Sequence, residues 1–176
     1  MASSRIKFSC LQNLVWNEAA FKEGLDFVCH LFGVRSVLPD QETILKKFFQ
    51  GRHVYFSAPT GYGKSLIYQS MPLIADHLLE RPLFTSMILV ISPLKALMYD
   101  QVKYLNSIGM SAVAITGEED ESMLKAMHEN GGYNLVFASP ECMLAVKRWR
   151  EYLTCEHIKE NLIAVAFDEA HCISQW

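Results

Sequence analysis

Short apolar runs separated by segments of helical periodicity constrain the fold of this chain more than any other feature of its sequence. The longest runs are apolar throughout instead of alternating with polar residues, which is typical of strands covered on both faces of a parallel sheet. The alternation of the two patterns predicts an α/β fold with a doubly wound, mostly parallel sheet. We expect five strands, at residues 53–58, 85–92, 111–116, 133–139 and 161–167, and helices between them at 64–80, 94–109, 118–130 and 140–154.

The composition fits one folded domain preceded by a helical segment. The chain has 176 residues, of which 51% are hydrophobic and 20% charged, so it can bury a core. Apolar residues at helical spacing predict an N-terminal helical segment at 1–31, and the domain occupies 32–176. A further amphipathic helix is expected at 41–51. The formal net charge of −3 gives no overall positive field, so any binding of nucleic acid would depend on local elements.

The cysteines and the apolar stretches limit the class of protein. Five cysteines, an odd number without a CxxC pair, predict reduced thiols in a cytosolic or nuclear protein. A zinc site is disfavoured because the candidate ligands lack the short paired spacing of such sites. Those candidates are Cys155, His157, His171 and Cys172. The first residues contain no apolar core of signal-peptide length and the longest apolar stretches are strand-sized, so we expect no membrane span.

The stretch APTGYGKS, Ala58–Ser65, lies between a predicted strand and a predicted helix, which is the setting of a phosphate loop. Gly61 and Gly63 allow several backbone N–H groups to face one concavity. Lys64 supplies a charge for the β- and γ-phosphates, and the Ser65 hydroxyl suits Mg²⁺. The alternative is a glycine-rich turn with an exposed lysine, since the first position is alanine where the general pattern has glycine. The residues expected to hold the nucleotide are Thr60, Gly61, Tyr62, Gly63, Lys64 and Ser65.

Two carboxylates follow the last apolar run directly. Because the carboxyl ends of parallel strands open on one edge of a sheet, both should lie near the phosphate loop. Asp168 can hold Mg²⁺, and Glu169 can orient and deprotonate the attacking water. His171 is then a candidate sensor of the γ-phosphate. The alternative is a solvated acidic helix start. Together with Lys64, Asp168 and Glu169 are the candidate catalytic residues.

Four motifs resemble those of the first motor domain of RecQ-family DNA helicases. In chain order they are APTGYGKSLIYQ, SPLKALMYDQ, ASPE and DEAHCISQW, and CISQW after DEAH is the most specific. The resemblance covers the chain from about Phe32 to Trp176. It implies a RecA-like P-loop NTPase domain that uses ATP and Mg²⁺ in an enzyme that unwinds DNA with 3′ to 5′ polarity. It also implies roles in DNA repair and recombination and, for a eukaryotic protein, a nuclear location.

The resemblance also assigns roles to single residues. Gln41 falls where the family keeps a glutamine that reads the adenine edge. The segment Ser92–Gln101 would lie along single-stranded DNA. Gln175 and Trp176 match the start of an aromatic-rich loop that couples DNA binding to ATP hydrolysis. The residues expected in DNA binding and coupling are Pro93, Lys95, His171, Gln175 and Trp176.

Departures from the family pattern restrict what this chain is expected to do alone. Val34 replaces an aromatic residue and Leu38 an arginine that contacts the nucleotide, which weakens the adenine side of the pocket. The sequence contains no SAT motif, second RecA-like lobe, arginine-finger motif or zinc-binding region. We therefore expect the chain alone not to unwind DNA. It is either the nucleotide-binding lobe of a helicase or a truncated, non-catalytic module that binds ATP or DNA.

Overall fold

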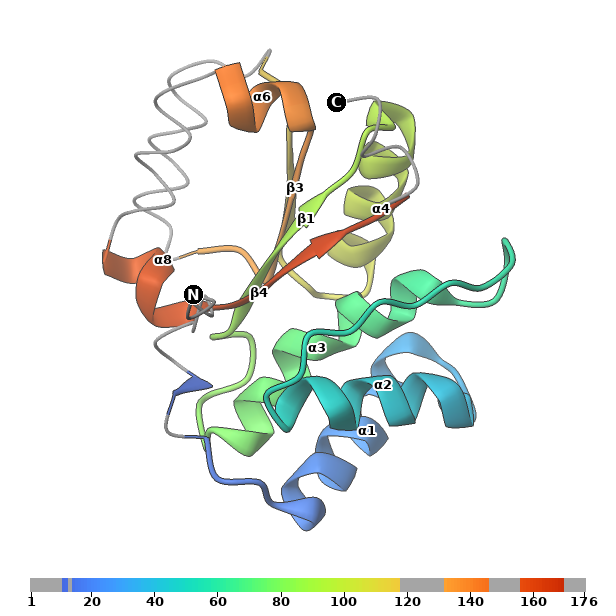
Figure 1. Cartoon of the computed structure of the whole chain (residues 1–176), viewed down its shortest axis with the longest axis vertical. Helices are drawn as coiled ribbons and strands as arrows, with labels where there is room; N and C mark the ends of the chain where they lie inside the picture. The colour runs from blue at the N-terminus through green and yellow to red at the C-terminus, as the bar shows by residue number, and fades with distance from the viewer. Residues whose placement is uncertain (1–10, 13, 118–131, 146–155, 170–176) are drawn as a thin grey trace, which may run out of the picture.

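A parallel sheet of four strands, in the order β2-β3-β1-β4, forms the centre of the described structure (Figure 1). The computed structural model describes residues 11–12, 14–117, 132–145 and 156–169. The strands are β1 (Met87–Ile91), β2 (Ala112–Ile115), β3 (Leu135–Ala138) and β4 (Leu162–Phe167). Because β1 pairs with both β3 and β4, it is an interior strand, and its register sets Ile91 opposite Phe167 at the carboxyl end.

The described helices are α1 (Glu18–Phe32), α2 (Pro39–Phe49), α3 (Lys64–Leu78), α4 (Lys95–Ser107), α6 (Pro140–Ala145) and α8 (Glu156–Asn161). Local signals set where the first two begin. The Asn17 side chain accepts hydrogen bonds from the first backbone N–H groups of α1, as an N-cap residue does. Pro39 stands in the first turn of α2, where its missing N–H leaves no hydrogen bond unmade.

Helices cover both faces of the sheet, which confirms the doubly wound α/β prediction. On one face, Ile88 and Val90 of β1 join a core made with α1, α3 and α4. On the other face, Leu89 and Ile91 pack with Cys142 of α6 and Ile158 of α8. The central strand is therefore buried on both sides, as its uninterrupted apolar sequence requires.

The predicted strand at 53–58 is wrong. These residues are not a strand, and in the described structure none of their backbone N–H groups donates to a backbone carbonyl. The run alternates in composition like a strand, but no described segment pairs with it, and a strand exists only as part of a ladder. The sheet of the described ranges therefore has four strands where five were expected.

Other boundaries also differ from the sequence prediction. The helix expected within 1–31 begins at Glu18, because residues 14–17 are not helical and Asn17 is the N-cap of α1. Helix α8 was not predicted, since six residues are too few to show a helical period. The helix expected at 118–130 and the last part of the one expected at 140–154 lie outside the described residues. No helix in the described ranges is long and apolar enough to cross a membrane.

Helix α3 is the most deeply embedded helix of the described structure, with ten of its fifteen residues buried. It packs against α1 on one side and against β1 and β4 on the other. Near its end, the buried Asp76 carboxylate accepts hydrogen bonds from the N–H groups of Thr85 and Ser86, which lead into β1. Burial raises the pKa of Asp76, and these N–H donors oppose that effect. The position of α3 relative to the sheet is therefore fixed by burial from Tyr68 to Leu78.

The close packing of α1 on α3 predicts that Gly24 cannot be enlarged. A Cβ atom at Gly24 would lie 3.0 Å from the Ile74 Cα, which leaves no space for a longer side chain. We expect Gly24→Leu to lower the free energy of unfolding by about 1–3 kcal/mol because the two helices must separate. Urea unfolding measures this. Glu23→Leu, at an exposed position on the same helix, is the control and should change stability by less than about 0.5 kcal/mol. Equal effects of the two variants would contradict the packing described here.

Candidate functional site

The phosphate loop ends where the buried helix α3 begins. Gly61 and Gly63 have φ angles of 83° and 81°, in the left-handed region that residues with a Cβ rarely adopt. Gly63 is the N-cap of α3, and Lys64 is its first residue. The loop amides and the positive end of the helix dipole are thus next to each other, which is the arrangement that binds phosphate.

The Lys64 ammonium group is held by the loop itself. Its Nζ donates to the Ala58 carbonyl oxygen at 2.8 Å and to the Pro59 carbonyl oxygen at 3.4 Å. A bound triphosphate would compete with these two carbonyl oxygens for the ammonium. Because a phosphate carries full negative charge, it is the stronger acceptor of the three.

The Gln41 side chain, on helix α2, hydrogen-bonds to the phosphate loop. Its Nε2 donates to the carbonyl oxygens of Tyr62, at 3.3 Å, and Gly63, at 3.0 Å, while its Oε1 accepts from the Leu38 N–H at 2.8 Å. The side chain is buried, and both ends of its amide are engaged. In this structure Gln41 therefore positions the loop, and its expected role in reading adenine remains a prediction.

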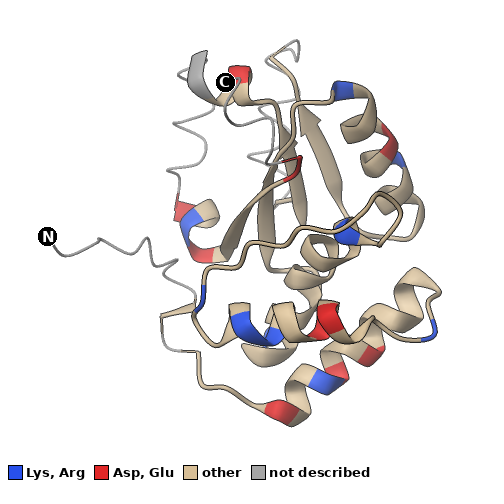
Figure 2. Cartoon of the chain, turned by 45° about the vertical axis from the view of Figure 1, so that its right-hand side comes forward, with Lys and Arg blue, Asp and Glu red and all other residues tan. Residues whose placement is uncertain are grey.

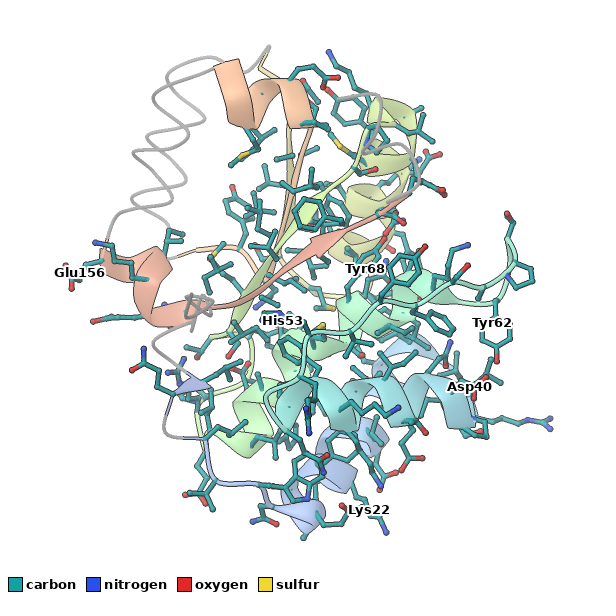
Figure 3. The ribbon with its side chains drawn as sticks, in the orientation of Figure 1. Lys22, Asp40, His53, Tyr62, Tyr68 and Glu156 are labelled. Carbon is teal, nitrogen blue, oxygen red and sulfur yellow. The ribbon has the colours of Figure 1, made fainter. Side chains whose placement is uncertain are left out.

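A second contact joins the same two elements at the surface. The Tyr62 hydroxyl donates to Asp40 Oδ2 at 2.8 Å, and the two side chains point toward one another from the loop and from α2 (Figure 3). This hydrogen bond to Asp40 is the main cause that raises the pKa of Tyr62. Helix α2 thus contacts the loop through both a buried amide and an exposed phenol.

Asp168 and Glu169 lie at the carboxyl end of β4, where the sequence analysis expected them. The Asp168 N–H donates to the Ile91 carbonyl oxygen at 2.9 Å, which extends the ladder between β1 and β4 by one residue. Glu169 has a φ of 52°, so the chain turns sharply after the strand. Its N–H donates to Asp168 Oδ1 at 3.0 Å and orients that carboxylate.

Tyr68 links the phosphate-loop helix to the acidic strand end. Its hydroxyl lies 3.1 Å from Asp168 Oδ2 and 3.1 Å from Gln101 Oε1, so it bridges β4 and α4 from one turn inside α3. Burial, and then the negative charge of Asp168, raise the pKa of Tyr68, so the phenol keeps its proton and acts as a donor. Sequence reasoning missed this residue. Its signals were its place in the motif APTGYGKSLIYQ and a polar run, Tyr68–Ser70, between apolar residues of the predicted helix.

Ser65 enters the same network through helix α4. Gln101 Nε2 donates to Ser65 Oγ at 3.4 Å, and Gln101 Oε1 also accepts from Gln69 Nε2 at 2.7 Å. Gln101 therefore contacts Ser65, one of the two residues expected to bind a metal, and shares with Asp168, the other, the single hydroxyl proton of Tyr68. The role of Gln101 was also missed.

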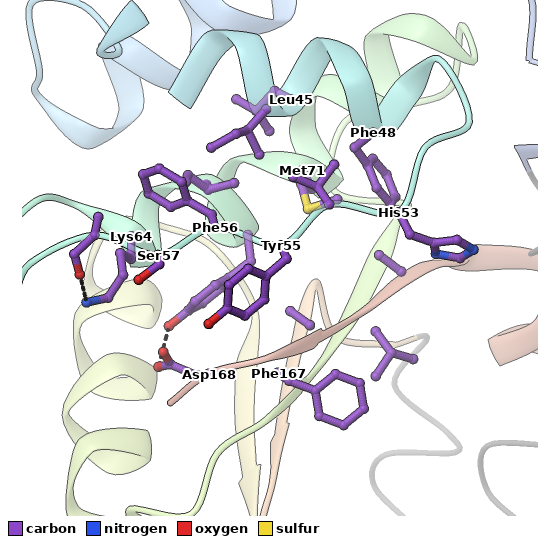
Figure 4. A pocket seen from close by; sticks show the side chains of 18 of the residues that line it. Leu45, Phe48, His53, Tyr55, Phe56, Ser57, Lys64, Met71, Phe167 and Asp168 are labelled. Carbon is purple, nitrogen blue, oxygen red and sulfur yellow. Dashed lines mark hydrogen bonds between the residues drawn. The ribbon is translucent and has the colours of Figure 1, made fainter. Parts of the chain in front are cut away.

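A pocket of about 590 Å³ opens between the loop segment and β4. Lys64, Ser57 and Asp168 gather toward one end of it, and His53 lies at the other end (Figure 4). Among its described lining residues, Lys64 is the only lysine or arginine. Apolar side chains from α2, α3 and β4 form much of the remaining wall. The pocket has the size and mixed character of a nucleotide or cofactor site.

The structure describes only some of the residues that were expected to contact DNA. Pro93 and Lys95 lie at the junction between β1 and α4, on the carboxyl edge of the sheet that also carries Asp168. His171, Gln175 and Trp176 lie outside the described residues. Of the two departures from the family pattern, Leu38 is exposed and caps α2, and Val34 is half-buried behind the end of α1.

Charge on the described surface is mixed in sign. Acidic and basic residues share helices α1 and α2 in Figure 2, and Lys46 forms ion pairs with Glu18 and Glu42. No group of three His, Cys, Asp or Glu side chains in the described ranges is placed to hold a metal by itself. The oxygens of Ser65 and Asp168 instead suit Mg²⁺, which binds few protein ligands and completes its shell with phosphate and water.

Comparison with known proteins defines the class to which this site belongs. Residues 38–176 match the family described as DEAD/DEAH box helicase. The chain belongs to this helicase family.

The similar proteins are ATP-dependent helicases. Over 159 residues the chain is 31% identical to ATP-dependent helicase wrn-1 of Caenorhabditis elegans, with 88% of this chain and 14% of the relative covered. It is 34% identical over 152 residues to ATP-dependent DNA helicase Q-like 2 of Arabidopsis thaliana, with 84% and 20% covered. It is 30% identical over 169 residues to ATP-dependent DNA helicase Q1 of Pongo abelii, with 92% and 25% covered. The resemblance to RecQ-family helicases is confirmed, and the chain spans a quarter or less of the length of these relatives.

A solved structure shows the same fold. The DUF1998 helicase MrfA, in a crystal structure described as bound to DNA and AMPPNP, aligns with a TM-score of 0.70 over 89% of this chain and 22% of its own. The sequence identity is 20%, so this likeness concerns the fold alone.

The contacts of Gln41 predict that its loss loosens the phosphate loop. In Gln41→Leu the Leu38 N–H and two loop carbonyls lose their partner, so we expect the loop amides at 60–63 to exchange hydrogen faster. Stability should fall by about 1–2 kcal/mol. Hydrogen exchange followed by mass spectrometry measures the first effect, and urea unfolding the second.

Thr43→Ala is the control for this prediction, because it removes one exposed hydrogen bond to the Pro39 carbonyl within the same helix. It should leave exchange in the loop unchanged. If Gln41→Leu also left loop exchange unchanged, Gln41 would not hold the loop.

Proposed function

We propose that this chain is the nucleotide-binding lobe of a RecQ-type, ATP-dependent 3′ to 5′ DNA helicase. The observation that carries the proposal is the meeting of the phosphate loop and the acidic end of β4 at one pocket, with Tyr68 bridging α3 and Asp168. The family match and the ATP-dependent relatives support the same conclusion. Coupling of ATP hydrolysis to strand separation belongs to the whole enzyme.

ATP and Mg²⁺ fit the chemistry of the phosphate loop and of the end of β4. Of the residues expected to hold them, Lys64, Asp168 and Glu169 line the pocket, whereas Thr60–Gly63 and Ser65 lie outside its lining. The amides of Thr60, Gly61, Tyr62 and Gly63 and the Lys64 ammonium would hold the phosphates. Ser65 and Asp168 would hold Mg²⁺, and the bound ion would neutralise phosphate charge. Gln41 would face the adenine after exchanging its loop contacts. Val34 and Leu38 remove two family contacts on that side, so we expect weak recognition of the base.

Glu169 would orient the attacking water and accept its proton. It follows Asp168 directly, and its backbone turn aims the chain away from the strand. In the described part of the pocket only Lys64 supplies a lysine or arginine charge, whereas related NTPases gain several orders of magnitude in rate from an added arginine. This favours binding of Mg-ATP with very slow hydrolysis by the 176 residues alone. It equally supports the second candidate, a non-catalytic module that binds ATP or DNA.

The DNA partner would be single-stranded or partly unwound. Pro93 and Lys95 stand at the start of α4, on the nucleotide edge of the sheet, where Lys95 and the first helical amides can meet phosphate. His171, Gln175 and Trp176 would add coupling contacts, as the resemblance implies. We also propose that the protein acts in DNA repair and recombination and that it is located in the nucleus.

The nucleotide assignment predicts the effect of removing Lys64. Lys64→Ala should weaken binding of a fluorescent ATP analogue in Mg²⁺ by at least about tenfold, since a charge-assisted contact to phosphate is lost. Circular dichroism should be unchanged because the hydrogen bonds that Lys64 makes in the described structure go to two loop carbonyls. Lys47→Ala, at an exposed position on α2, is the charge-matched control and should bind normally. Equal affinities of the Lys64→Ala variant and the unmodified chain would refute the assigned role.

The DNA assignment predicts a salt-dependent effect at Lys95. Lys95→Ala should weaken binding of single-stranded DNA and reduce the slope of log affinity against log salt by about 0.7, the value for one lost phosphate contact on a single strand. Fluorescence anisotropy over a salt series measures both. Lys22→Ala, on α1, removes the same charge from a different helix and should leave the slope unchanged. An unchanged slope in Lys95→Ala would show that Lys95 does not contact phosphate.

A further inference from the structure

The buried amide of Gln101 is placed on α4 but makes its contacts with other helices. Its side chain is 9% exposed and hydrogen-bonds to Ser65, Tyr68 and Gln69, all on α3 and more than thirty residues away in sequence. The other buried residues of α4 are Met98 and Leu105. An apolar residue at 101 would therefore continue the stripe by which α4 packs, and packing alone does not require a glutamine.

Two groups of this network touch the metal side of the proposed site. Gln101 Nε2 donates to Ser65 Oγ and so fixes one lone pair of that hydroxyl, leaving the other to face a ligand. Tyr68 has one hydroxyl proton and two acceptors, Gln101 Oε1 and Asp168 Oδ2, at equal distances. Only one acceptor can receive the proton at a time. When a cation neutralises Asp168, the proton is free to turn to Gln101.

We propose that Gln101 is a positioning residue for binding of the nucleotide's metal ion, because it orients Ser65 directly and offers the Tyr68 hydroxyl proton a second acceptor beside Asp168. The inference rests on the proposed function, because it assumes that Ser65 and Asp168 bind the metal. Gln101 itself touches neither metal nor nucleotide. It sets the direction of the Ser65 hydroxyl and receives the Tyr68 proton when a cation neutralises Asp168.

The position of Gln101 along α4 gives the network a second consequence. Lys95 begins the same helix, about 9 Å along its axis from Gln101 at 1.5 Å per residue. A nucleic-acid strand that shifts the start of α4 would move the Gln101 amide relative to Ser65 and Tyr68. If DNA binding there changed the affinity for the metal nucleotide by some factor, the metal nucleotide would change the affinity for DNA by the same factor.

The test measures the metal-dependent part of nucleotide affinity. Dissociation constants of a fluorescent ATP analogue for the 176-residue chain are determined in Mg²⁺ and in EDTA, and their ratio is the metal-dependent gain. Gln101→Met keeps the length of the side chain and removes its amide. We expect the gain to fall by about three- to tenfold, the effect of one oriented hydrogen bond, with affinity in EDTA changed less than about twofold.

Two further variants keep the test decisive. Tyr68→Phe removes only the hydroxyl and should also lower the gain, even if Gln101→Met fails to fold. Asn106→Ala is the matched control, because it removes a side-chain amide of α4 that bonds to Ala112 and lies outside the network. It should leave the gain unchanged.

The outcomes distinguish a failure of the proposed nucleotide site from a failure of the role proposed for Gln101. If the unmodified chain shows no metal-dependent gain, the proposed nucleotide site is wrong. If it shows the gain and Gln101→Met and Tyr68→Phe retain it, the site stands and the positioning role is overturned. A variant that loses affinity equally in Mg²⁺ and in EDTA would indicate a general structural role, which also overturns the inference.

Discussion

The burial of helix α3 between α1 and the sheet is the constraint on which the candidate site depends. One end of this helix carries Lys64 and Ser65, and its first buried turn carries Tyr68, which reaches Asp168. Because the rest of α3 is packed on both sides, the helix cannot shift against β4 without exposing the core. The loop before it has no such support. Gln41 and the Asp40–Tyr62 contact hold that loop to α2, and within the described ranges no ladder holds residues 53–58.

The parts of the fold that sequence alone predicted are those determined locally. Strands β1 and β3 are apolar throughout, so their burial follows from composition. The glycines of APTGYGKS predict a turn before a helix. Residues 53–58 have strand composition, but a strand needs a neighbour, and no sequence pattern shows whether one is present. Helix α8 is six residues long and leaves no periodic signal.

The same distinction separates the site residues that were foreseen from those that were not. Lys64, Ser65, Asp168 and Glu169 belong to motifs whose spacing carries chemical meaning. The Gln101 and Tyr68 hydrogen bonds join α3, α4 and β4 across 33 and 100 residues, so they follow only from how these elements pack. The sequence offers two hints: both residues stand in the quoted motifs, APTGYGKSLIYQ and SPLKALMYDQ, and both are polar within predicted helices. Such residues must find partners, but sequence does not reveal which.

The central claim is that the phosphate loop and the end of β4 form one metal-nucleotide site. Amide relaxation in the isotope-labelled chain, with Mn²⁺-ATP in place of Mg²⁺-ATP, tests it directly, because relaxation by Mn²⁺ falls steeply with distance from the ion. We expect Ser65 and Asp168 to relax fastest together, while α8 (Glu156–Asn161), on the opposite face of the sheet, is affected least. Fast relaxation at the loop without Asp168, or at neither, would contradict a shared site.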